Sequence, residues 1–155
     1  MLATTIAVLG TLLGAIVAGA FQQKTAGRAE RAANTAQLRR DRLDAVTELA
    51  AAGSDHRRAM WMRGEAVLNE APAEVVQELR RASHVTRAAI TRPHVAVQVL
   101  MPDTDVQAAA TEMVTAAYRM RDASTSTEDL TAAREAARTA HDRFVSAAAA
   151  YMQTA

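Results

Sequence analysis

An uncharged stretch at the start of the chain constrains the fold more than any other feature. Residues 2–21 contain no Asp, Glu, Lys, Arg or His. As a helix, this stretch would span ~30 Å, the thickness of the hydrocarbon core of a bilayer. A helix that packs on a soluble core keeps a polar stripe, and this stretch has almost none. A soluble core helix is therefore the least favoured interpretation, which leaves a membrane anchor or a cleaved export signal.

The charges that flank this stretch favour an anchor. An export signal carries basic residues before its apolar run, whereas here Lys24, Arg28 and Arg31 follow it. Because basic residues stay on the cytoplasmic side of a membrane, we expect a transmembrane anchor over residues 1–23. The protein would then be a single-pass protein of the cell membrane, with its N-terminus outside and its C-terminus in the cytoplasm. The alternative is a secreted helical binding module released by cleavage after Ala20, at a site of small residues.

Small residues recur at four-residue intervals within the expected anchor. Gly10, Gly14 and Ala18 lie on one helix face, where small side chains let two membrane helices approach closely. This spacing favours association of two copies of the chain, although glycine is common in membrane helices and the spacing is equally compatible with chance. We expect the lipid bilayer and a second copy of the chain as partners.

The composition of the whole chain indicates an all-α fold. Apolar residues make up 50% and aromatic residues only 3%, and there are three prolines. An alanine-rich core with few rings favours closely packed helices, because alanine has the highest helix propensity. The chain has no cysteine, which excludes disulfides, thiol nucleophiles and cysteine metal sites.

Hydrophobic periodicity and helix-start signals place the expected helices. We expect a transmembrane helix that continues into a long helix, followed by an antiparallel bundle of about four helices. The cytoplasmic bundle, residues 24–155, would comprise helices over residues 24–70, 73–100, 103–122 and 127–152. Pro72 is suited to the first turn of the second helix, and Pro93 is expected to kink or end it. Residues 94–100 contain alternating valines typical of a strand, but a strand would have no partner, so we expect a continued helix.

Two apolar seams and two caps refine this scheme. In the first helix the seam is interrupted at Gly53 and Gly64, and we expect a bend or break at Gly53. Its members follow three- and four-residue steps: Leu43, Val46, Ala50, Gly53, Met60 and Val67. In the last helix the seam is more regular: Leu130, Arg134, Ala137, His141, Phe144, Ala148 and Tyr151. Asp103 or Thr104 is the expected cap of the third helix, and Thr125 with Glu128 forms the expected capping box of the fourth.

The sequence contains no motif for catalysis, for a cofactor or for a metal. His56, His84, His94 and His141 are scattered, without the spacing of a zinc site. No phosphate-binding loop and no nucleophile elbow is present. We therefore expect a protein that is not an enzyme, and we assign no catalytic, cofactor-binding or metal-binding residue.

Arginine clusters raise nucleic acid as a further possible partner. Residues 24–63 carry nine basic and five acidic side chains, so the acidic side chains offset more than half of the positive charge. The aromatic rings on which bases stack are nearly absent. A nucleic-acid-binding bundle is thus a second alternative, and direct binding is disfavoured relative to solvated helix faces or attraction to anionic headgroups.

One segment combines the only tryptophan with methionines and arginines. Its members are Arg57, Arg58, Met60, Trp61 and Met62. A tryptophan in a helical bundle is usually a core anchor with methionine filling the gaps around it. An exposed patch with arginines stacked on the ring, which would bind a partner, is the alternative.

These residues also carry a family resemblance. The uncharged first helix, RAER at residues 28–31, LRRDRLDAV at 38–46 and DHRRAMW at 55–61 resemble the KilB-type spread proteins of conjugative plasmids in filamentous actinobacteria. The resemblance implies a small membrane-associated protein linked to the spread of transferred plasmid DNA within the recipient mycelium. It implies an accessory role beside other plasmid-transfer proteins, such as a DNA translocase, and it supplies no catalytic residues.

Overall fold

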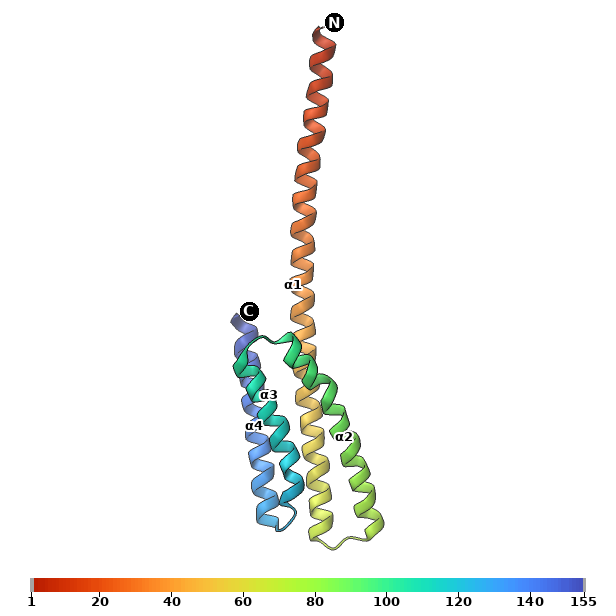
Figure 1. Ribbon diagram of the computed structural model, residues 1–155, viewed down its shortest axis with the longest axis vertical. Helices are drawn as coiled ribbons and strands as arrows, with labels where there is room; N and C mark the ends of the chain where they lie inside the picture. Colours follow the sequence, from red (N-terminus) through yellow and green to blue (C-terminus); the bar gives the residue numbers. More distant parts are fainter. Residues whose placement is uncertain (1, 155) are drawn as a thin grey trace. The chain divides into compact units, whose positions relative to one another are not determined.

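The computed structural model describes the backbone of residues 2–154 and the side chains of residues 27–154. Its elements are α1 (Leu2–Leu68), α2 (Ala73–Leu100), α3 (Thr104–Arg119), the short 3-10 helix η1 (Met120–Ala123) and α4 (Thr127–Thr154) (Figure 1). No strand occurs in this part of the chain, which confirms the all-α prediction. The chain divides into two units, one up to Arg39 and one from Arg40 onward.

From Arg40 onward the chain forms a bundle of four helical segments that run alternately up and down (Figure 1). Short turns join them, at residues 69–72, 101–103 and 124–126. The largest shared core contains residues from all four helices, including Leu49, Ile90, Met113 and Phe144. In the other unit, residues 28–39 are all exposed on α1.

The prediction for the proline and the valines of α2 is partly confirmed. The helix continues through residues 94–100, as expected, so Pro93 does not end it. Pro93 removes one helical hydrogen bond, but its ring is buried in the bundle. Val97 is fully buried, whereas Val95 and Val99 are 55% and 75% exposed. The strand-like alternation thus reflects two faces of one helix.

The predicted apolar seam of α1 is partly wrong. Leu43 and Val67 are exposed by 54% and 42%. Gly53 and Met60 of the predicted seam are buried, and the other buried positions follow a neighbouring stripe: Ala45, Leu49, His56 and Gly64. Since alanine and leucine occur on both faces of this helix, the pattern alone does not discriminate between two stripes that differ by a small rotation about its axis.

The predicted break at Gly53 is wrong, because α1 is continuous through both Gly53 and Gly64. The two glycines are instead points of close approach between helices. A Cβ atom added at Gly64 would lie 2.7 Å from both δ carbons of Leu130 on α4. One added at Gly53 would lie 3.1 Å from Cε of Met113 on α3.

The ends of the helices explain the short turns. Glu70 has a φ of 51°, and Ala71 N–H donates to Ala66 O at 2.9 Å, the pattern that closes a helix with a left-handed residue. Asp103 caps α3 by accepting from Asp105 and Val106 N–H at 3.0 and 2.9 Å, as predicted.

The expected capping box of α4 is displaced by one residue. Asp129 N–H donates to Ser126 Oγ at 3.0 Å, and Ser126 Oγ donates back to the Asp129 carboxylate at 2.7 Å. Ser126 therefore caps α4 with Asp129 as its partner, in place of Thr125 and Glu128. Thr125 supports it by donating to the same carboxylate at 2.7 Å, and these hydrogen bonds lower the pKa of Asp129.

Arg42 ties α1 to two other helices. Its Nε donates to the carbonyl of Leu100 at 2.9 Å, which satisfies one of the free carbonyls at the C-terminus of α2. Its guanidinium also lies 5.4 Å from the ring centre of Tyr151 on α4. An arginine interpreted from sequence as a solvated or headgroup-attracted charge therefore has a structural contact within the bundle.

Among residues 27–154 no helix is both long and apolar enough to cross a membrane. The predicted anchor, residues 1–23, lies outside the side chains that the structure describes. The same holds for Gly10, Gly14 and Ala18, the predicted contact face of that anchor, and for the alternative cleavage position Ala20.

Candidate functional site

The tryptophan segment lies where α1 faces η1 and α4. Met60 is 4% exposed and packs in a second core cluster with Met120, Leu130 and Ala137. Trp61 is half-buried at the edge of that cluster. The cation on its ring is Arg134 of α4, whose guanidinium carbon lies 4.4 Å from the ring centre. The sequence had suggested arginines of the same segment for this role.

The other members of the segment are spread around the helix. Arg58 is exposed, Arg57 is half-buried, and Met62 is 47% exposed. The structure thus brings Met60 and Trp61 to the core and its margin, and it does not gather the five predicted residues into one patch. Arg134 was visible in sequence only as a charged residue at a seam position of the last helix.

A buried polar chain links α1 to α2 one turn away from this cluster. His56 is 2% exposed, and its Nδ1 lies 2.9 Å from Thr86 Oγ1. The Thr86 hydroxyl donates to the carbonyl of Ser83 at 3.1 Å, and Ser83 Oγ donates to the carbonyl of Arg80 at 2.7 Å. Because the single Thr86 hydroxyl proton points to Ser83, the proton in the first contact belongs to Nδ1 of His56.

The surroundings of His56 favour its neutral form. Burial lowers its pKa to about 4, and the positive charge of Arg87 contributes in the same direction. The ring of Tyr118 on α3 meets the imidazole edge-on at 5.4 Å between centroids. The guanidinium of Arg87 in turn lies 4.4 Å from the centre of the Tyr118 ring.

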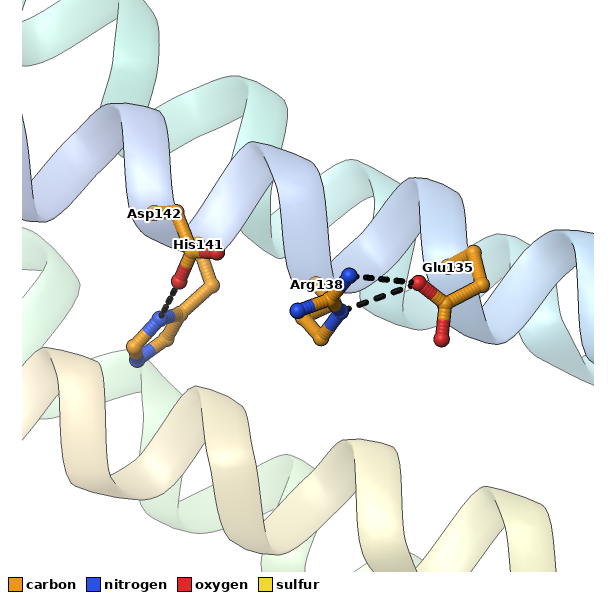
Figure 2. A network of polar contacts seen from close by, with 4 residues as sticks. All are labelled: Glu135, Arg138, His141 and Asp142. Carbon is orange, nitrogen blue, oxygen red and sulfur yellow. Dashed lines mark hydrogen bonds and ion pairs between the residues drawn. The ribbon is translucent and has the colours of Figure 1, made fainter.

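An apolar groove runs between α1 and α4. It has a volume of ≈ 520 Å³. Small and apolar side chains line most of it, including Val46, Ala50, Ala51, Val145, Ala148 and Met152. Figure 2 shows polar side chains of α4 on the side toward α1. His141 Nδ1 lies 3.3 Å from the Asp142 carboxylate, and Arg138 pairs with Glu135 at 2.9 Å.

A second apolar surface lies on the outside of α2, opposite its buried face. Val85, Val95 and Val99 are 71%, 55% and 75% exposed, and Ala88 is exposed between them. With Arg92, their positions follow three- and four-residue steps, so they form one stripe along the helix. We call Val85, Ala88, Val95 and Val99 the α2 stripe.

The histidines do not form a metal site within residues 27–154, where no group of three His, Asp or Glu side chains is placed to hold a metal ion. His56 and His141 have the partners described above. His94 lies 3.4 Å from the Gln98 amide, and burial lowers its pKa. His84 is exposed on α2.

Comparison with known proteins identifies the family. The family model described as KilB plasmid transfer protein matches residues 43–152, most of the bundle. The chain is also 44% identical to Protein KilB of Streptomyces lividans over 149 residues, which covers 96% of this chain and 97% of the relative. No solved structure matches. These matches confirm the resemblance found in the sequence: the chain belongs to the KilB plasmid transfer protein family.

Proposed function

We propose that this protein is a membrane-anchored helical interaction protein and an accessory factor in plasmid transfer. The family match and the end-to-end similarity to Protein KilB support a role related to plasmid transfer. In this role the protein does not catalyse a reaction. It acts by contacting other copies of itself and other transfer proteins during the spread of a plasmid within the recipient mycelium.

The anchor is supported by the sequence of the first helix. Residues 2–21 are uncharged and long enough to span a bilayer. Basic residues follow on the C-terminal side, which favours a cytoplasmic bundle and an N-terminus outside the membrane. Sodium carbonate extraction of membranes should leave the protein in the pellet, and N-terminal sequencing should find residues before Phe21. A mature chain that begins at Phe21 would contradict the anchor and establish secretion.

The observation that carries the interaction role is the α2 stripe. Val85, Val95 and Val99 are exposed by more than half, and burying their apolar area against another helix is favourable by ~25 cal/mol per Å². Together with Ala88 and Arg92 they follow three- and four-residue steps, which is the spacing of a seam between two helices. A second copy of the chain, held beside the first in the same membrane, meets this stripe with an identical one.

Crosslinking in membranes tests this self-association. Substituting Val95→Glu and Val99→Glu together places two acidic side chains in the stripe, and we expect the crosslinked dimer to fall at least about tenfold. Ala89→Glu is the matched control, because Ala89 is exposed on the same helix outside the stripe. An undiminished dimer in the double variant would refute the interface, whereas the anchor is tested separately by carbonate extraction.

A further inference from the structure

A small polar cavity lies where α1, α2, α3 and η1 meet. Its volume is ≈ 100 Å³. The side chains around it include four arginines and two histidines: Arg63, Arg80, Arg87, Arg121, His56 and His84. None of the described residues that line it is acidic. We call this cavity the arginine pocket.

Helical spacing brings these cations together. Arg80, His84 and Arg87 follow steps of four and three along α2, so they share one face of that helix. His56 and Arg63 lie seven residues apart on α1, again on one face. The α2 side chains that line the pocket, Arg80, Ser83, His84 and Arg87, are therefore all polar, and on α1 Met60 lies between His56 and Arg63.

The charges of the pocket are only partly compensated. Arg121 pairs with Asp122 at 2.9 Å, and Arg87 lies over the ring of Tyr118. Arg63 and Arg80 make no ion pair with any carboxylate in the part of the chain that the structure describes. Like charges around a small volume repel one another, and an anion between them removes that repulsion.

His56 adds a ring nitrogen to the pocket. Every buried side-chain N or O atom among the described residues has a hydrogen-bond partner. His56 lines the pocket, and its only hydrogen bond is that of Nδ1 to Thr86. Its Nε2 makes no hydrogen bond and is therefore accessible to solvent, and we infer that this atom faces the pocket. Neutral His56 presents a lone pair there, and protonated His56 presents an N–H donor.

We propose that the arginine pocket binds one phosphate group, either free phosphate or the terminal phosphate of a nucleotide. Guanidinium groups donate paired N–H bonds that match the oxygens of a phosphate. A volume of ≈ 100 Å³ is large enough for one tetrahedral oxyanion and too small for a whole nucleotide, so the sugar and base would remain outside.

The small size of the cavity distinguishes this site from a surface that binds a DNA backbone. Such a surface presents a row of cations to successive phosphates, whereas the arginines here surround one cavity of ≈ 100 Å³. The proposal does not depend on the membrane anchor or on the α2 stripe.

Calorimetric titration of the whole protein in detergent, in a buffer free of phosphate and sulfate, tests the proposal. Inorganic phosphate and a nucleoside 5′-monophosphate are the two probes, and each should bind with a stoichiometry of one. Arg80→Gln and Arg63→Gln should each weaken binding at least about tenfold, the loss expected for one charge-assisted hydrogen bond. Preference for one probe identifies the source of the phosphate.

Two matched controls remove the same charge outside the pocket. Arg92→Gln is on α2 and Arg58→Gln is on α1, and both positions are exposed. Both variants should bind phosphate within about twofold of the unmodified protein, since long-range effects of exposed charges are screened by salt. Absence of binding by both probes would overturn the proposal, as would equal losses in pocket and control variants. Tight binding of a DNA oligonucleotide with equal losses in all four variants would indicate a general basic surface instead.

The imidazole of His56 provides a second measurement that locates the ligand. The charged and titratable side chains that line the same cavity as His56 come from every helix around it: Arg80, His84 and Arg87 of α2, Arg63 of α1, Arg121 of η1 and Tyr118 of α3. Phosphate among these groups should raise the pKa of His56 in an NMR titration of its ring, because an anion stabilises the protonated form. Binding of phosphate that leaves the His56 resonances unchanged would place the ligand elsewhere and contradict the proposal.

Discussion

At the scale of single residues, His56 couples the packing of α1 and α2 to protonation. Its Nδ1–H donates a hydrogen bond to Thr86 Oγ1, and its ring is buried against Tyr118. A protonated imidazole at this position would place a buried charge beside the cation of Arg87, which costs free energy.

The free energy of unfolding should therefore fall in mild acid. The pKa of His56 is about 4 in the fold, compared with 6.5 for the unperturbed group. The unfolded chain thus binds more protons between these values, and stability is lost as pH falls through 6.5 toward 4. We expect a loss of about 2 kcal/mol between pH 7 and pH 5. Urea unfolding followed by the fluorescence of Trp61, the only tryptophan, measures it.

His56→Gln should flatten most of this pH dependence, and His84→Gln, at an exposed position, should retain it. A smaller slope remains from His94, whose pKa is also lowered by burial. If His56→Gln kept the full slope, the buried imidazole would not be its source.

At the scale of helices, short connections and caps could be predicted, but the contacts between helices could not. Helix starts can be predicted because a cap depends only on residues within one turn; here they are marked by Pro72, Asp103 and the serine-threonine run before α4. The observed cap, Ser126, lies one residue after the predicted cap, Thr125. Both are hydroxyl residues followed three positions later by an acidic residue, so the sequence pattern does not distinguish them. The sequence predicts a break at Gly53 and a gap in the apolar seam at Gly64, because the residues that approach these glycines, Met113 and Leu130, are distant in sequence.

The close approach at Gly64 has a direct consequence. Gly64→Ala should lower the free energy of unfolding by about 1–2 kcal/mol, since overpacking a core costs more than alanine gains in helix propensity. Leu130 is fully buried, so its δ carbons, 2.7 Å from the added methyl, have little room to move. Denaturation midpoints of the whole protein measure the change.

Gly53→Ala is the control on the same helix. The atoms nearest its added methyl are Cε and Sδ of Met113, at 3.1 and 3.3 Å, and a methionine side chain adapts readily. We expect a change within about 0.5 kcal/mol, because the gain in propensity offsets the contact. Equal destabilisation by both substitutions would show that the partner side chain does not decide the outcome.

At the scale of the whole molecule, the all-α class and the family could be predicted from sequence, and the candidate sites could not. The class follows from alanine content and periodicity. The family follows from local segments such as DHRRAMW. The arginine pocket depends on which face of α1 meets which face of α2, and the apolar pattern of α1 predicts a stripe that includes the exposed Leu43. The sequence alone does not show that Arg80, His84 and Arg87 of α2 line one cavity with His56 and Arg63 of α1.

The α2 stripe was also hidden in the sequence, for a related reason. Alternation of Val95, Val97 and Val99 raised the question of strand or helix. Once the segment is known to be helical, Val97 lies on the buried face and Val95 and Val99 lie on the exposed face. Surface exposure of valines is the feature that links the fold to an interaction role.

The spread of a marked plasmid through recipient mycelium tests the central claim most directly. Strains would carry the unmodified gene, the Val95→Glu and Val99→Glu double variant, or the Ala89→Glu control, with membrane-bound protein levels compared by immunoblot. We predict that the double variant remains in the membrane fraction but supports no more spread than a strain that lacks the gene, while the control supports normal spread. Normal spread with the double variant would contradict the claim that this protein acts through the α2 stripe.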